Sequence, residues 1–215
     1  MIRVLLADDE PLVRAGIAGI LGSDTDIEIV GEAGDGEACV HLAAKLRPDV
    51  AVMDIRMPLL DGLTAAERII AQNPAVRVVV VTTFDDETAV NRAVAAGVSG
   101  FLLKSGDPRE LISGVRAAAA GGASLSPTVA RHLLDRLRRT GTLEHDASID
   151  LLTDREREVL TLVGRGRSNA EIAQELFLTE GTVKGYVSVL LQRLQVRNRV
   201  EAAIVAYEGG LLAQR

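Results

Sequence analysis

The sequence predicts a doubly wound α/β fold with a five-stranded parallel sheet, followed by a small all-α domain. Over the first 120 residues, short apolar runs alternate with amphipathic stretches, the pattern of a parallel sheet covered by helices. Four of the apolar runs end in a polar residue, as expected where parallel strands deliver a site to one edge of the sheet. From residue 151 onward, the apolar residues follow the helical period alone.

Strands are expected where runs of Val, Ile, Leu and Ala are bounded by polar or turn residues, because a sheet covered on both faces is apolar throughout. The five expected strands lie at 2–7, 27–31, 49–53, 77–82 and 100–103. The second strand is the least continuously apolar, since Glu28 interrupts it. We therefore expect it at an edge of the sheet.

Helices are expected between the strands, where apolar residues recur three and four positions apart. The expected helices lie at 10–22, 36–46, 62–72, 86–96 and 108–120. Gly22, Pro74 and Gly97 are suitable stops for three of them. Regular alternation of strands and helices places helices on both faces of the sheet.

The division into domains follows from a break in this pattern at Gly121 and Gly122. We expect a first domain at 1–120 and a linker at 121–150 that includes a helix near 128–139. A second domain is expected at 151–215.

Start signals divide the second domain into four helices. Thr153 and Ser168 each stand three residues before a Glu, as in a capping box, and Thr179 is expected to cap a third helix. A fourth helix is expected from about Arg199 to Glu208.

Composition limits the class of protein. The 215 residues are 47% apolar but only 2% aromatic, so the core must be built from Val, Leu, Ile and Ala. No apolar run approaches the roughly 20 residues of a membrane span, and the N-terminus lacks a signal-peptide pattern, so we expect a cytoplasmic protein without membrane contact. Cys39, the one cysteine, excludes an internal disulfide and is expected to be a buried structural thiol.

The net charge of −6 is unevenly distributed. Residues 1–120 carry 11 Lys and Arg against 18 Asp and Glu, whereas residues 148–215 carry nine of each. Within the second domain, residues 165–199 hold six basic and three acidic side chains. This local excess of positive charge is a weak indication of phosphate binding.

Polar residues at the ends of four strands predict a single site. Asp8 and Asp9 follow the first strand, and Asp54 follows the third. Thr82 closes the fourth strand, and Lys104 follows the fifth. Because three neighbouring carboxylates repel one another unless a cation lies among them, we expect a Mg²⁺ site. Asp54 is then a candidate nucleophile toward phosphoryl groups.

Residues 1–120 resemble the receiver domain of two-component response regulators. The matching residues are Asp8, Asp9, Asp54, Met57, Pro58, Thr82, Lys104 and Ser105. The resemblance implies a flavodoxin-like fold, a sensor histidine kinase as phosphoryl donor and Asp54 as phosphoacceptor. It also implies that Asp9 binds Mg²⁺ directly, that Asp8 binds it through water, and that the backbone carbonyl of Arg56 is a further ligand.

Three further side chains have implied roles in phosphoryl binding and switching. Lys104 would pair with a phosphoryl oxygen, and the Thr82 hydroxyl would donate a hydrogen bond to one. Phe101 stands where receivers carry an aromatic residue that turns inward together with the Thr. Plain core packing is the other interpretation of Phe101.

The second domain resembles the LuxR-type helix-turn-helix, and with the receiver it is similar to the NarL/FixJ family. The matching segments are 152–160, 166–173 and 182–187. An apolar stripe is expected to dock the recognition helix on its neighbours. The candidate DNA-binding residues are Arg167, Ser168, Asn169, Glu180, Thr182, Lys184, Gly185, Ser188 and Arg193. Ser168 could serve only as a cap, and Arg193 could be a solvated charge.

The last helix has a face of small side chains, namely Ala202, Ala203, Val205 and Ala206. In this family that helix pairs two DNA-binding domains, so the resemblance implies a homodimer on double-stranded DNA after phosphorylation.

Taken together, these patterns predict a transcription regulator that a sensor histidine kinase switches through Asp54. We expect no enzymatic activity beyond the receiver's own phosphoryl acceptance and dephosphorylation. The alternative is a phosphorylation-independent DNA-binding regulator whose receiver only dimerises. A phosphatase of the haloacid-dehalogenase type is disfavoured, because that class needs a second acid at the position of Arg56.

Overall fold

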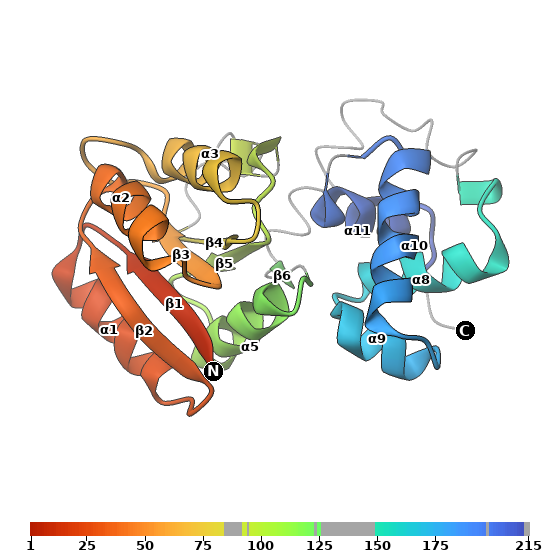
Figure 1. The fold of residues 1–215 in the computed structure, drawn as a ribbon, viewed down its shortest axis with the longest axis horizontal. Coiled ribbons are helices and arrows are strands. Elements are labelled where there is room, and N and C mark those ends of the chain that lie inside the picture. Colours follow the sequence, from red (N-terminus) through yellow and green to blue (C-terminus); the bar gives the residue numbers. More distant parts are fainter. Residues whose placement is uncertain (84–91, 94, 123, 126–148, 197, 213–215) are drawn as a thin grey trace.

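The computed structural model describes residues 1–83, 92–93, 95–122, 124–125, 149–196 and 198–212. Within these residues the chain forms two parts that lie side by side, one built around a sheet and one built of helices (Figure 1). None of the described helices is long and apolar enough to cross a membrane.

The sheet is parallel throughout and has the order β2-β1-β3-β4-β5-β6. Its strands are β1 (Ile2–Ala7), β2 (Ile27–Ala33), β3 (Val50–Asp54), β4 (Arg77–Thr82), β5 (Gly100–Leu103) and β6 (Ser124–Leu125). The predicted five-stranded doubly wound sheet is confirmed, and β2 lies at the edge, as its composition predicts. The two-residue β6 adds a sixth strand beside β5, inside the segment that the sequence assigned to the linker.

Helices cover both faces of the sheet, as Figure 1 shows. They are α1 (Pro11–Gly22), α2 (Gly36–Leu46), α3 (Gly62–Gln72) and α5 (Pro108–Ala119). Helices α1 and α5 pack on one face and α2 and α3 on the other, so the apolar strand residues are divided between two clusters. Asp35, Asp61 and Asp107 cap three of these helices by accepting hydrogen bonds from backbone N–H groups. Most of the helix expected at 86–96 lies outside the described residues.

The helical part contains α8 (Asp154–Gly164), α9 (Asn169–Glu175), α10 (Glu180–Arg193) and α11 (Arg199–Glu208). Thr153 and Ser168 form complete capping boxes, and Thr179 caps α10, which confirms the predicted helix starts. These helices enclose their own apolar cluster, in which Leu160 and Ile172 are fully buried. The helix expected near 128–139 lies outside the described residues.

The two parts also share apolar contacts. Val200 and Ile204 of α11 are buried, and they belong to the same apolar cluster as Val98 and other residues on the α2 and α3 face of the sheet. This cluster joins the last helix to the first domain.

Candidate functional site

The three predicted carboxylates meet at the carboxyl edge of the sheet. Asp8 and Asp9 follow β1, and Asp54 ends β3, which is the neighbour of β1. One oxygen from each carboxylate lies within 4.8 Å of the others. Asp8 is 1% exposed and Asp54 is 7% exposed, whereas Asp9 is open to solvent.

Lys104 completes this cluster from the end of β5. Its Nζ lies 3.0 Å from Oδ2 of Asp54 and 2.8 Å from Oδ2 of Asp8. The Lys104 backbone N–H donates to the carbonyl of Thr82 at 2.8 Å, which fixes the loop after β5 against the end of β4. Glu10 adds a carboxylate oxygen 3.6 Å from the same Nζ, a contact that sequence reasoning missed although Glu10 directly follows the acid pair.

Burial and the neighbouring charges act in opposite directions on the pKa values of Asp54 and Lys104. Burial raises the pKa of the Asp54 carboxyl above its ordinary value, although the hydrogen bond from Lys104 acts to lower it. For Lys104, burial alone would lower the pKa, but the contacts with Asp8 and Asp54 outweigh it and leave the pKa raised. Lys104 is therefore charged at neutral pH and holds the site together.

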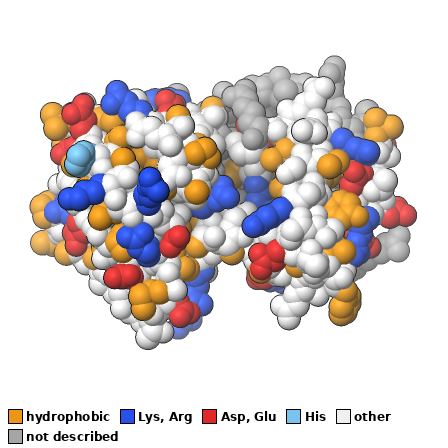
Figure 2. Space-filling view, viewed as in Figure 1, with side chains coloured by type: hydrophobic (Ala, Val, Ile, Leu, Met, Phe, Trp, Pro, Cys, Tyr) orange, Lys and Arg blue, Asp and Glu red, His pale blue; other side chains and the backbone are white. Residues whose placement is uncertain are grey.

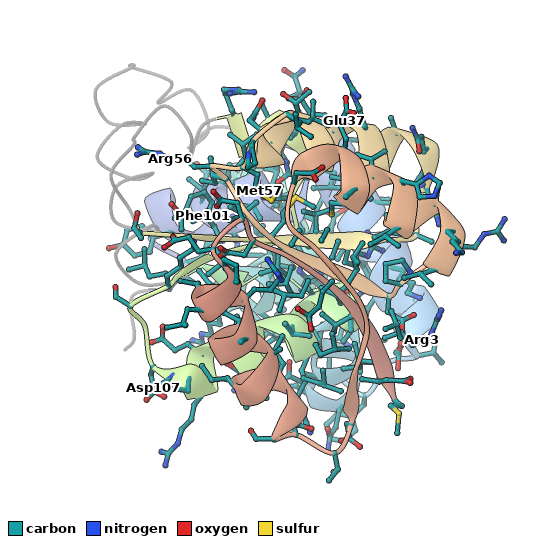
Figure 3. All side chains as sticks on the ribbon, turned by 90° about the vertical axis from the view of Figure 1, so that its left-hand side faces the viewer. Arg3, Glu37, Arg56, Met57, Phe101 and Asp107 are labelled. Carbon is teal, nitrogen blue, oxygen red and sulfur yellow. The ribbon has the colours of Figure 1, made fainter. Side chains whose placement is uncertain are left out.

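The residues present fit a bound Mg²⁺ ion. Three carboxylates face one ammonium group here, so negative charge is in excess. Oδ2 of Asp8 is buried and accepts no aligned hydrogen bond, even though the Lys104 ammonium lies at ion-pair distance. Carboxylate oxygens are the ligands that Mg²⁺ prefers. Arg56, whose backbone carbonyl was the fourth predicted ligand, directs its side chain outward (Figure 3).

A glycine allows the loop after β3 to fold back on Asp54. The Gly62 backbone N–H donates to the carbonyl of Ile55 at 2.8 Å. A Cβ atom at position 62 would lie 1.8 Å from the backbone oxygen of Asp54, far inside the contact distance. Asp61 then caps α3 through the backbone N–H groups of Leu63 and Thr64. The position of Asp54 therefore depends on a residue without a side chain.

Phe101 lies in the interior, in the middle of β5. It is 1% exposed and belongs to the same apolar cluster as Met57, on the side of the sheet that α2 and α3 cover (Figure 3). Thr82 is half-buried at the end of β4, where the predicted switch requires a hydroxyl. The position of Phe101 agrees with core packing, and its role in switching stays a prediction.

The second candidate site is the outer face of α10. Val183, Leu190 and Leu194 are buried against the other helices, which confirms the predicted apolar stripe. The five residues expected on the outer face are all exposed, namely Glu180, Thr182, Lys184, Gly185 and Ser188.

Two arginines predicted to contact DNA form ion pairs inside their own domain. Nη1 of Arg193 lies 3.0 Å from Oε2 of Glu156, a carboxylate that is only 5% exposed and that also completes the capping box of α8. Arg167 lies on the surface, 3.4 Å from Glu171 on the next turn. Arg193 is therefore held by α8, whereas the Arg167 pair is weak and exposed.

The predicted DNA contacts of Ser168 and Asn169 stay predictions, and in this arrangement both side chains are buried and bonded within the domain. The Ser168 hydroxyl accepts from the backbone N–H of Glu171. Oδ1 of Asn169 accepts from Nη1 of Arg199 at 2.8 Å. These two residues shape the start of α9, where Asn169 also lines the cavity between the two domains.

The predicted pairing face of α11 is also corrected. Ala202, Val205 and Ala206 are buried in the core of their own domain, and only Ala203 is partly exposed. Their small size lets α11 approach α8 so closely that a Cβ added at Gly164 would lie 2.8 Å from that of Ala206. A face of small residues suits close packing within one chain as well as between two chains, and sequence alone does not separate these uses.

One side of the outer face of α10 borders the first domain. Lys184 and Ser188 line a cavity of about 530 Å³ whose opposite wall includes Arg77 and Val98. A recognition helix must enter the major groove to read bases. In this arrangement the first domain borders the recognition helix at Lys184 and Ser188, whereas Glu180, Thr182 and Gly185 lie outside the cavity lining.

Comparisons with known proteins match both domains. Residues 4–116 match the family "Response regulator receiver domain", and residues 150–206 match "Bacterial regulatory proteins, luxR family". The transcriptional regulatory protein LiaR of Bacillus subtilis is 40% identical over 214 residues, which cover 99% of this chain and 100% of LiaR. Response regulator protein VraR of Staphylococcus aureus is 35% identical, and the match covers 98% of this chain and 99% of VraR.

Solved structures are similar over the whole chain as well. The crystal structure of response regulator ChrA, from a haem-sensing two-component system, is 37% identical with a TM-score of 0.55, and the match covers 98% of each chain. A structure of two RcsB dimers bound to two parallel DNAs is 27% identical with a TM-score of 0.57, and the match covers 96% of each chain.

Proposed function

The chain belongs to the NarL/LuxR family of two-component response regulators, with a receiver and a LuxR-type DNA-binding domain, and from this premise we propose that phosphorylation of Asp54 switches its binding to DNA. The observation that carries the proposal is the cluster of Asp8, Asp9, Asp54 and Lys104 at one sheet edge, in a chain whose recognition helix faces the receiver. The donor is a sensor histidine kinase, and the DNA target places the action of the protein in the cytoplasm.

The proposed reaction moves a phosphoryl group from a kinase phosphohistidine to Asp54. A carboxylate oxygen of Asp54 attacks the phosphorus, the O–P bond forms as the P–N bond breaks, and the leaving imidazole takes up a proton. Bound Mg²⁺, held by the three carboxylates and the backbone carbonyl of Arg56, would screen the charge of the incoming group. Lys104 would exchange its contact with Asp54 for a phosphoryl oxygen, and Thr82 would donate a hydrogen bond to another. We propose no turnover beyond acceptance and hydrolysis of this group.

The proposed consequence is separation of the two domains. The receiver wall of the cavity faces Lys184 and Ser188, so it would obstruct the approach of a DNA duplex to this side of α10. A shift from 1% to 99% of molecules in the open form requires about 5.5 kcal/mol of differential stabilisation. Three sources would together supply this free energy: phosphoryl contacts at Asp54 and Lys104, contacts with DNA, and pairing of two chains on adjacent half-sites.

The proposal is tested by measuring binding to genomic DNA fragments in the presence of Mg²⁺. The measurement is made with and without beryllofluoride, which mimics the phosphoryl group. We expect beryllofluoride to tighten binding to a palindromic site in the wild type and to have no effect on Asp54→Asn. The Lys184→Ala variant should bind beryllofluoride normally and DNA weakly. Equal DNA binding with and without beryllofluoride in the wild type would instead support the phosphorylation-independent regulator.

A further inference from the structure

The cavity between the two domains has an unusual charge balance. Its volume is about 530 Å³, within the range of small-molecule sites. Three of its described lining residues are cationic, namely Arg77 from the receiver and Lys184 and Arg199 from the DNA-binding domain, and none is Asp or Glu. Figure 2 shows Lys and Arg side chains along the boundary between the two halves of the molecule. Positive charge is therefore concentrated where the two domains face each other.

Arg199 lines this cavity and is a buried cation without an ion pair among the described residues. It is 9% exposed. Nη1 donates to Oδ1 of Asn169 and Nη2 donates to the carbonyl of Arg167, but Nε is buried and has no acceptor in the described part of the chain. Burial lowers the pKa of the guanidinium to about 10, with Glu171 acting weakly in the opposite direction, so Arg199 is still charged at neutral pH. A buried charge of this kind is costly unless an anion compensates it.

The other two cations are exposed and come from separate domains. Arg77 begins β4, and Lys184 lies on the outer face of α10. Neither has an ion pair among the residues that the structure describes. Ser99 and Ser188 add hydroxyl groups to the lining, and Val98 and Leu191 add apolar surface. The cavity thus offers guanidinium groups, an ammonium group, hydroxyl donors and an apolar wall.

We propose that this cavity binds a small phosphorylated anion, and that the bound anion holds the receiver against the recognition helix and so opposes DNA binding. The exposed Arg77 guanidinium can match the oxygens of a phosphate with paired hydrogen bonds, the Lys184 ammonium adds a point charge, and Arg199 adds positive charge from the buried wall. The ligand would join cations of both domains, so it stabilises only the arrangement in which they face each other. This site lies apart from Asp54 and does not depend on its phosphorylation.

Calorimetric titration of the full chain tests the proposal, with EDTA present so that nothing binds through a metal at the carboxylates. The probes are inorganic phosphate, pyrophosphate and ADP. We expect saturable binding of pyrophosphate or ADP with one site per chain. Arg77→Gln and Lys184→Gln should each weaken it by about tenfold or more, equivalent to about 1.4 kcal/mol. Arg109→Gln removes an equally exposed arginine outside the cavity and should leave affinity unchanged.

Further measurements identify the part of the ligand that is recognised and test whether binding depends on Asp54. Tighter binding of ADP than of pyrophosphate would show that the apolar wall holds the nucleoside, and equal binding would show that the phosphates alone are recognised. Asp54→Asn should bind the probes like the wild type, so a failure of the phosphorylation model leaves this result intact. The ligand should weaken DNA binding of the wild type and have less effect on Arg77→Gln. Absence of saturable binding below about 1 mM, or equal weakening by Arg109→Gln, would overturn the proposal.

Discussion

Substitution of Gly62 by alanine is expected to destabilise the receiver and to displace Asp54. The added Cβ would lie 1.8 Å from the Asp54 oxygen, 2.9 Å from its carbonyl carbon and 3.1 Å from the Cα of Ile55. All three atoms belong to the backbone, so no side chain can rotate away to relieve the contact. The loop after β3 must move, and the hydrogen bond from Gly62 to Ile55 would be strained or lost.

The magnitude follows from these two effects. Overpacking in a rigid environment costs roughly 1–3 kcal/mol, and a lost backbone hydrogen bond costs about 1 kcal/mol more. The free energy of unfolding of the receiver should therefore fall by about 2–4 kcal/mol, which corresponds to a loss in Tm on the order of 10 °C. Beryllofluoride binding should also weaken, because the Asp54 carboxylate moves with its own backbone.

Thermal and urea unfolding, with Gly185→Ala as control, measure this effect. Gly185 lies in the exposed part of α10, with no neighbouring atom within 4 Å of an added Cβ. The same chemical change should therefore stabilise the DNA-binding domain there by roughly 0.5–1 kcal/mol, since alanine favours a helix. If Gly62→Ala unfolds within about 0.5 kcal/mol of the wild type and binds beryllofluoride normally, the close approach at Asp54 does not constrain the loop.

Three other substitutions have expected outcomes. Lys104→Met removes the cation between Asp8 and Asp54, so the free energy of unfolding without metal should fall by about 1–3 kcal/mol. Added Mg²⁺ should stabilise this variant more than it stabilises the wild type. An unchanged free energy of unfolding without metal would contradict the pairing. Burial raises the folded-state pKa of Asp54 above the unfolded value of 3.8. Between these two pKa values the folded state binds the proton more tightly than the unfolded state does, so the free energy of unfolding falls as the pH rises from 3.8 through the folded-state pKa. Asp54→Asn should remove that decline and raise the urea midpoint at neutral pH, and an unchanged pH profile would count against burial as the cause. Arg193→Ala should cost at most about 1 kcal/mol, because its pair with Glu156 is half open to solvent, and a large loss of DNA affinity without loss of stability would restore Arg193 as a DNA contact.

The sequence predicted the phosphoacceptor edge well, because its signal is local. A parallel strand that is apolar to its end fixes where the following polar residue lies, so the meeting of Asp8, Asp54 and Lys104 follows from strand order alone. The helix caps at Thr153 and Ser168 were equally predictable from sequence, since each depends on a Glu three residues away.

Features that depend on distant partners could not be predicted in the same way. Strand β6 forms because its two residues find an open edge beside β5, which no local pattern reveals. The small side chains of Ala202 and Ala206 fit either a partner chain or α8, and only the fold shows that they pack on α8. The cavity that gathers Arg77, Lys184 and Arg199 likewise appears only once the two domains stand together.

We expect the shared apolar cluster to make the response depend on the amount of protein in the cell. If the domains part, Val200 and Ile204 lose their cover, at a cost on the order of 2 kcal/mol, and burial against a second copy would recover it. Opening and pairing would then be one concentration-dependent step, so we expect the activation midpoint to move with expression level. A midpoint that stays fixed over a tenfold range of protein would show that opened monomers persist unpaired.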